Sequence, residues 1–192
     1  ARGGRWAEGP GASLMDAIID SSDFLIAEDL GMAGDAAIRL RDAYNLHGMS
    51  ILQFGWGYDA PPHHLDHIPE RVVAYTGTHD NDTFAGWYSK ISSDDKKRVR
   101  TSLGCNSADV PMEAVKRLMS SKAEIVIIPL QDVLGLGSSA RTNTPGLVSK
   151  RNWSWMAPDH WESHHSWAWL SESVKSSGRL PWHDGRESSL GY

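Results

Sequence analysis

The chain has 192 residues, of which 40% are hydrophobic and 22% charged, as is usual for a globular protein. Its formal net charge of -5 disfavours nucleic acid as a partner, because neutralising phosphates requires a surplus of Lys and Arg. No apolar run approaches the roughly 20 residues of a membrane helix, and no signal peptide is visible. A membrane partner is therefore not expected, and the single cysteine, Cys105, excludes an intrachain disulfide.

Apolar runs alternate with helical patterns along the chain. After a glycine-rich loop over residues 1–11, a helix is predicted over 12–19 and a first strand over 23–27. The elements predicted after these are a helix over 35–44, a strand over 49–54, a loop over 61–69, a strand over 71–76, helices over 93–103 and 111–119, and a strand over 124–130. No element is predicted after Trp153.

This alternation of strands and helices is the pattern of a parallel sheet covered by helices. The spacing of the four strands suits successive units of a barrel. Four strands make only half of a barrel, however, and a complete one takes about 250 residues. The chain is therefore expected to be the second half of something larger.

Acidic residues follow two of the predicted strands directly. Glu28 and Asp29 come after the first strand, and His79 and Asp80 come after the third. Acids in this place project from the carboxyl end of a sheet, so we expect Glu28 and Asp80 to face one another across a sugar site. The alternatives are an ion pair or helix cap for Glu28 and Asp29, and a turn for 79–82 in which Asp82 caps the next helix.

Two further patterns are similar to ligand sites but lack the spacing or residues that such sites need. His63, His64, Asp66 and His67 are of metal-binding type, but they lie in a proline-flanked loop without the spacing of a metal site. Residues 135–137 read Gly-Leu-Gly but lack the further glycine and the lysine that cradle phosphate. No metal and no cofactor are therefore expected.

Four motifs in order resemble one known family. They are IAEDLG (26–31), LQF (52–54), YTGTHDND (75–82) and IPLQDVLGLGSSARTNTPG (128–146), the last followed by Asn152-Trp153. Together they are similar to the 4-α-glucanotransferases, also called amylomaltases or disproportionating enzymes, of glycoside hydrolase family 77. The resemblance runs from about Trp6 to Trp155.

The resemblance implies a (β/α)8 TIM barrel of the α-amylase clan, of which this chain would hold strands 5–8. Residues 1–192 would form the C-terminal part of the catalytic domain. Strands 1–4 would lie outside this sequence, together with the nucleophile, an aspartate in an Arg-Ile-Asp-His-like motif. By the same resemblance Glu28 is the acid/base and Asp80 the stabiliser of the transition state.

Four other residues are expected to bind the sugar. The resemblance and their places after strands indicate His79, Asp29, Phe54 and Asn143. Phe54 and Trp56 could each stack on glucose or fill the top of the barrel. Asn143 could contact substrate or only shape its loop.

The implied activity is transfer of a 1,4-α-D-glucan segment to a new 4-position by a retaining double displacement. The expected partners are maltooligosaccharide donors and acceptors, and exposed sheet edges would permit self-association. The expected compartment is the cytoplasm, or the plastid for a plant protein. The alternatives are an incomplete fragment that at most binds glucan, and an α-glucan hydrolase of the same clan.

Overall fold

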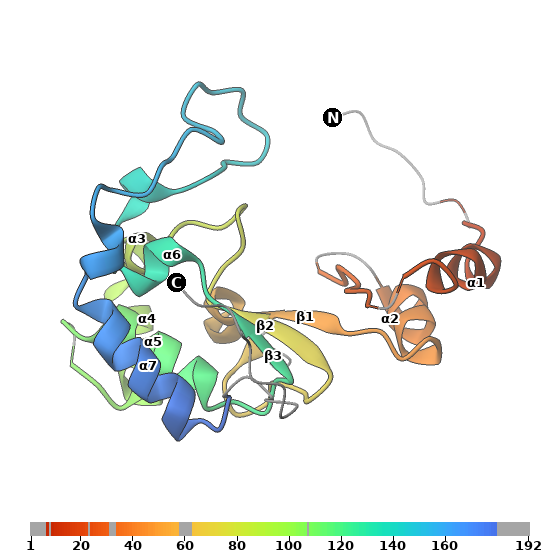
Figure 1. Cartoon of the computed structure of the whole chain (residues 1–192), viewed down its shortest axis with the longest axis horizontal. Helices are drawn as coiled ribbons and strands as arrows, with labels where there is room; N and C mark the ends of the chain where they lie inside the picture. The colour runs from red at the N-terminus through yellow and green to blue at the C-terminus, as the bar shows by residue number, and fades with distance from the viewer. Residues whose placement is uncertain are drawn as a thin grey trace, which may run out of the picture.

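The computed structural model describes residues 7, 9–22, 24–30, 34–57, 63–106 and 108–179. Their centre is a parallel sheet in the order β1 (Gly48–Ile51), β2 (Val72–Tyr75) and β3 (Ile125–Ile127) (Figure 1). The three strands end in register, because Ile51 pairs with Tyr75 and Tyr75 pairs with Ile127. The residues that follow the strands therefore emerge along one edge of the sheet, which confirms the predicted parallel arrangement.

Helices precede the sheet, connect its strands and follow it. They are α1 (Ala12–Ile19), α2 (Gly34–Ala43), η1 (Leu52–Trp56), α3 (Phe84–Lys90), α4 (Ser93–Leu103), α5 (Val110–Met119), α6 (Leu130–Val133), η3 (Ser138–Ala140), η4 (Trp161–Ser163) and α7 (Ser166–Ser176). The four predicted helices correspond to α1, α2, α4 and α5. The sequence pattern did not predict α6 or α7, and it indicated α3 only through the alternative in which Asp82 caps a following helix.

The predicted first strand is reduced to a single bridge. Ile26 pairs in parallel with His47, and the Ala27 N–H donates to the His47 carbonyl over 2.8 Å. Asp23 lies outside the described residues. Within the described residues this segment forms no other strand pairing. The bridge nevertheless places the segment beside β1, as the prediction required.

Two other predicted strands are shorter than their apolar runs. The run 49–54 leaves the sheet after Ile51 and turns into η1, where a Cβ on Gly55 would lie 2.6 Å from the His63 carbonyl oxygen. The run 124–130 leaves it after Ile127, and Pro129, which has no N–H for a ladder, is the N-cap of α6. The hydrophobic pattern does not predict where these two strands end, because the turns that follow them also contain buried residues.

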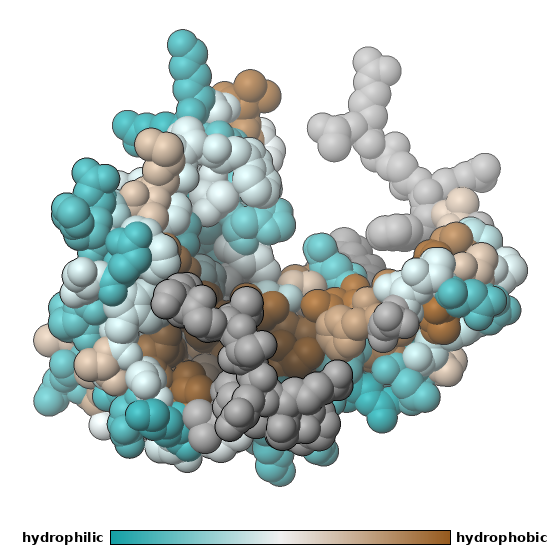
Figure 2. All heavy atoms as spheres, in the orientation of Figure 1, coloured by the Kyte–Doolittle hydropathy of each residue, from teal (hydrophilic) through white to brown (hydrophobic). Residues whose placement is uncertain are grey.

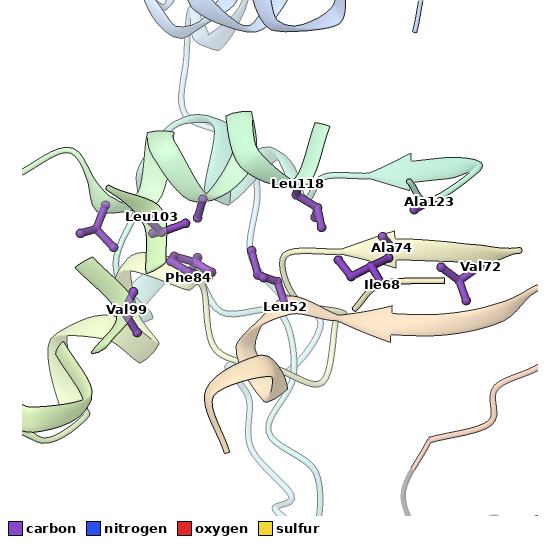
Figure 3. Close-up of a cluster of buried hydrophobic side chains, with 11 residues drawn as sticks. Leu52, Ile68, Val72, Ala74, Phe84, Val99, Leu103, Leu118 and Ala123 are labelled. Carbon is purple, nitrogen blue, oxygen red and sulfur yellow. The ribbon is translucent and has the colours of Figure 1, made fainter. Parts of the chain in front are cut away.

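The core lies between the sheet and helices α3 to α5 (Figure 3). On α5, Val110, Ala114 and Leu118 recur every fourth residue and so occupy one buried face. The remaining members of the cluster are Leu52, Ile68, Val72, Ala74, Phe84, Val99, Leu103 and Ala123. This packing fixes the position of the loops at the carboxyl ends of the strands.

The sheet is not covered evenly. Val72, Val73 and Ala74 of the central strand β2 are buried, whereas Ile127 of the edge strand β3 is exposed. Figure 2 shows hydrophobic residues open to the surface along the middle of the molecule. An exposed apolar edge is a surface on which further strands can pair.

Helix α7 packs against α5 and α6, and Arg179, which follows α7, binds the turn between α5 and β3. Its guanidinium donates to the carbonyl oxygens of Met119, Ser121 and Ala123 over 2.6, 2.9 and 2.6 Å. These carbonyls end α5 and lead into β3, so one side chain satisfies several acceptors in that turn. Helices α5 and α7 lie side by side as a result (Figure 1).

None of the helices in the described ranges combines the length and the apolar character that crossing a membrane demands.

Candidate active site

Most of the residues that the sequence predicts for a sugar site line one cavity. It has a volume of about 580 Å³ and is lined by Glu28, Phe54, His79 and Asp80. The other residues along its wall are Leu30, Met49, Tyr75, Gly77, Thr78, Asn81, Ile127, Pro129 and Pro145. Glu28 and Asp80, from segments far apart in the chain, thus reach the same cavity.

Asp80 is held in place from the loop that follows η3. Its Oδ1 accepts a hydrogen bond of 2.6 Å from the Asn143 side-chain amide, and its carbonyl accepts one of 2.7 Å from Arg141. His79 Nε2 lies 3.4 Å from the same Oδ1. Asn143 therefore touches the predicted stabiliser directly, a contact that the sequence did not indicate. Asn143 does not itself line the cavity.

Glu28 stands free in the cavity wall. It is exposed, and within the described ranges it has no hydrogen-bond or ion-pair partner. The adjacent Leu30 lines the same cavity, whereas Asp29 does not. A carboxylate without a protein partner is available to a ligand, so the alternatives of an ion pair or a helix cap do not describe Glu28.

Asp29 turns the other way and has a structural role. Its carboxylate forms an ion pair with Arg41 of α2 and accepts a hydrogen bond of 2.8 Å from the Met49 N–H. A Cβ at Gly48 would lie 2.5 Å from Asp29 Oδ2, so glycine is needed there. The structure does not place Asp29 at the cavity, because its contacts bind the segment of Glu28 to β1.

The two aromatic residues after β1 differ in their surroundings. Phe54 is exposed to the cavity, and its ring lies 5.6 Å from that of His63. Trp56 instead stacks on Trp87 at 5.6 Å and packs against Phe84 in the core. Of the two alternatives, stacking on a sugar remains open to Phe54, and Trp56 fills the interior.

The loop carrying Asp80 is clamped through Asp82. The Asp82 carboxylate accepts from Lys90 over 2.6 Å and from the Ser138 hydroxyl over 2.8 Å. Burial raises the pKa of this carboxyl, but Lys90 and Ser138 outweigh that effect and hold the pKa below its ordinary value. In the alternative interpretation of residues 79–82 as a turn, Asp82 caps the next helix. In the structure the cap is Thr83, whose hydroxyl accepts from the Gly86 N–H.

Gln53 holds the same loop from the other side. Its Nε2 donates to the Asp82 carbonyl over 2.7 Å, and its side chain is buried. A Cβ on Gly77 would lie 2.6 Å from Gln53 Nε2. The glycine in YTGTHDND therefore makes room for the glutamine in LQF, which connects two of the motifs physically.

Asp132 is a buried carboxylate beneath this loop, and the sequence pattern predicts no role for it. It is 2% exposed, accepts a hydrogen bond from the Thr76 hydroxyl and accepts another of 2.7 Å from the Phe84 N–H. It thus joins the end of β2 to the start of α3. Burial raises the pKa of Asp132 to about 6, against the opposing effect of the two hydrogen bonds. The sequence feature that could have identified Asp132 is its position after the fourth apolar run.

Replacing Asp132 by Asn is expected to change how stability depends on pH. The folded protein keeps a proton on Asp132 up to about pH 6, whereas an unfolded chain releases it near pH 3.9. The free energy of unfolding therefore falls as the pH rises through that window, by on the order of 3 kcal/mol. Asn is uncharged and keeps both contacts, since its oxygen accepts from Phe84 and its amide donates to Thr76.

Denaturant unfolding of the wild-type protein and D132N from pH 4 to 8 tests this expectation. The variant should gain stability relative to the wild type as the pH rises from 4 to 6, and little more above pH 7. The exposed Asp159, which forms no ion pair within the described ranges, supplies the control, because D159N should show a nearly constant difference. A constant difference for D132N as well would show that Asp132 does not titrate in this range.

The histidines and the other polar clusters do not form a metal site in the parts of the chain that the structure describes. No group of three or more His, Cys, Asp or Glu side chains there could hold an ion. His63 Nδ1 accepts from the Ile51 N–H over 3.3 Å, and burial lowers the pKa of His63.

Carboxylates that follow the strands of a parallel sheet, Glu28 and Asp80, line one cavity, and this places the chain among the α/β proteins that build sites at the carboxyl edge of the sheet. Comparison with known proteins identifies the family of α/β proteins that this chain resembles. The family described as 4-alpha-glucanotransferase matches residues 1–160. The 4-alpha-glucanotransferase of Solanum tuberosum, named chloroplastic/amyloplastic, is 43% identical over 159 residues, which cover 81% of this chain and 27% of that protein.

A 4-alpha-glucanotransferase from Synechocystis sp. is 36% identical over 193 residues and covers 95% of this chain and 37% of that protein. The solved amylomaltase from Streptococcus agalactiae, in complex with acarbose, superposes with a TM-score of 0.83 at 25% identity. The superposition covers 91% of this chain and 36% of that structure.

The chain belongs to the 4-alpha-glucanotransferase family, as its ordered motifs predicted. It spans between about a quarter and just over a third of the length of these relatives.

Proposed function

We propose that this chain forms strands 5–8 of a (β/α)8 barrel and supplies part of the active site of a 4-α-glucanotransferase. In this assignment the bridged segment at Ile26 is strand 5, and β1, β2 and β3 are strands 6, 7 and 8. The parallel order of these segments, which follows the order of the chain, supports the assignment. The exposed edge at Ile127 suits a further strand. Residues 1–192 are then the C-terminal part of the catalytic domain.

The observation that carries the proposal is the convergence of Glu28 and Asp80 on one cavity in a chain of this family. Retaining cleavage of an α-1,4 bond needs a nucleophilic carboxylate and, about 5 Å away, an acid that later acts as base. Glu28 suits the acid/base role because it is free in the cavity. The nucleophile is assigned to a part of the protein outside this sequence.

Asp80 is proposed to stabilise the oxocarbenium-like transition state. Its carboxylate is fixed by Asn143 but keeps exposed surface toward the cavity, so its charge can act on a bound sugar. His79 and Phe54 on the same wall are proposed to bind that sugar through a hydrogen bond and through ring contact. The donors and acceptors are maltooligosaccharides, and the chemistry assigned to these residues requires no cofactor.

Chromatography of the products formed from maltotriose by the full-length protein tests the proposal. A ladder of longer and shorter oligosaccharides is expected, since longer products form only by transfer. Glucose and maltose without longer products would favour an α-glucan hydrolase of the same clan. Unchanged maltotriose would exclude both activities.

The 192-residue chain by itself should leave maltotriose unchanged, because Glu28 and Asp80 lack a nucleophile. Turnover by this chain alone would contradict the assignment of the nucleophile to another part of the protein. Saturable binding of maltooligosaccharide without turnover is compatible with a divided catalytic set.

A further inference from the structure

Trp153 is an exposed aromatic side chain beside the candidate active site. It is 66% exposed, whereas Trp56 stacks on Trp87 and Trp161 packs against Trp167. It belongs to the segment after η3, which projects as a loop in Figure 1. A large ring left open in this way has an apolar face available to a ligand.

One face of the Trp153 ring is already supported by the protein. Its centroid lies 5.1 Å from that of the His79 ring, with an angle of 36° between the planes. His79 in turn lines the cavity and lies within 3.4 Å of the Asp80 carboxylate. The supported ring therefore stands one side chain away from the proposed transition-state stabiliser.

The backbone holds Trp153 in an unusual conformation. Its φ is 60°, in the left-handed region that a bulky residue rarely adopts. The Trp153 N–H donates to the Thr142 carbonyl over 2.7 Å, and the side chain of Asn152 bonds to Thr144 and Leu147. Strained residues persist where their surroundings enforce them, and they are concentrated at functional sites.

These contacts tie the ring to the site itself. Thr142, which anchors Trp153, directly precedes Asn143. Asn143 donates through its N–H to the His79 carbonyl over 3.1 Å and through its side chain to Asp80 over 2.6 Å. Trp153, His79 and Asp80 are therefore positioned by one short stretch of the same loop.

We propose that the free face of Trp153 is a stacking platform for a hexose ring of an α-glucan, adjacent to the ring held at Asp80. This inference rests on the proposed function, because it assigns a subsite next to the same cavity, beside His79. The face of a glucose ring presents C–H groups, which pack on an indole while the hydroxyl groups remain in water. The platform would strengthen binding of oligosaccharides long enough to reach it.

The test compares W153A, W153F and wild type in the full-length protein, with maltooligosaccharides of increasing length as substrates. For W153A we expect KM to rise about 5- to 10-fold for the longer substrates, as loss of an aromatic contact implies, with a smaller rise for the shortest. W153F should recover most of the loss, because a phenyl ring also stacks. The 83% exposed Met156 supplies the control variant M156A, which should behave as wild type.

A purely structural Trp153 would lower kcat or stability equally for all lengths, and that result would overturn the inference. Identical kinetics of W153A and M156A would also overturn the inference about Trp153. In that case transfer activity of the wild-type protein would still support the proposed function. If the wild type has no activity, the proposed function fails. Calorimetric titration with maltoheptaose then tests the inference about Trp153. Weaker binding by W153A than by the wild type supports the inference. Equal binding by the two proteins, or no binding by the wild type, refutes it.

Discussion

Replacing Glu28 by Gln in the full-length protein is expected to lower the rate of glucan transfer from maltotriose by about 10²- to 10⁴-fold, the range for loss of a general acid/base. Gln has nearly the shape of Glu, so the cavity should keep its form. The amide cannot protonate the leaving oxygen or deprotonate the acceptor hydroxyl. Since Glu28 has no partner in the described ranges, its replacement breaks no ion pair there.

A donor with a better leaving group separates the two steps of this reaction. Fluoride departs from maltosyl fluoride without protonation, so the first step should recover in E28Q. The second step still lacks its base, and a glycosylated protein should accumulate and be detected by mass spectrometry. The exposed Glu172 on α7 gives the matched control, since E172Q should behave as wild type. Equal slowness of E28Q with fluoride and with maltotriose would contradict its role as the acid.

The places of Glu28 and Asp80 could be predicted because they depend on a local rule. Each follows an apolar run, and the carboxyl ends of parallel strands meet at one edge. The same rule placed His79 and Phe54 on the cavity. A sequence records which residues follow a strand, so such residues can be found without the structure.

The direction of a side chain beyond a strand end could not be predicted in this way. Asp29 follows the same run as Glu28, but Arg41 and the Met49 N–H draw its carboxylate away from the cavity. Asn143 is a candidate for substrate contact, and the structure adds a hydrogen bond from its side chain to Asp80 that the sequence did not indicate. These outcomes depend on partners far along the chain, which only the packed fold brings together.

Asp132 is a buried example of a side chain whose direction could not be predicted from the sequence. Its sequence context, after the fourth apolar run, is similar to that of Glu28. Glu28 faces a cavity and Asp132 lies under α3, so one is free and the other is bound by Thr76 and Phe84. The sequence therefore identified the edge of the sheet at which the site lies, and packing decided which carboxylates are open to a ligand.

Replacing Asp80 by Asn is expected to lower transfer by about 10²- to 10³-fold, comparable with loss of an electrostatic contact made in the transition state. The variant removes the negative charge that would face the oxocarbenium-like sugar. Maltosyl fluoride should not restore the rate, because the missing group stabilises charge on the ring and does not act on the leaving group. This lack of recovery distinguishes D80N from E28Q.

The hydrogen bond from Asn143 allows a sharper test of the role of Asp80. Removing this donor with N143A should cost about 10- to 15-fold in rate, near the lower end for a hydrogen bond to a charged group. In the D80N background the same change should cost much less, because the oriented carboxylate is already gone. A double-mutant cycle with this coupling would show that Asn143 acts through Asp80. Additive losses would instead indicate that Asn143 binds the sugar itself, as the sequence first allowed.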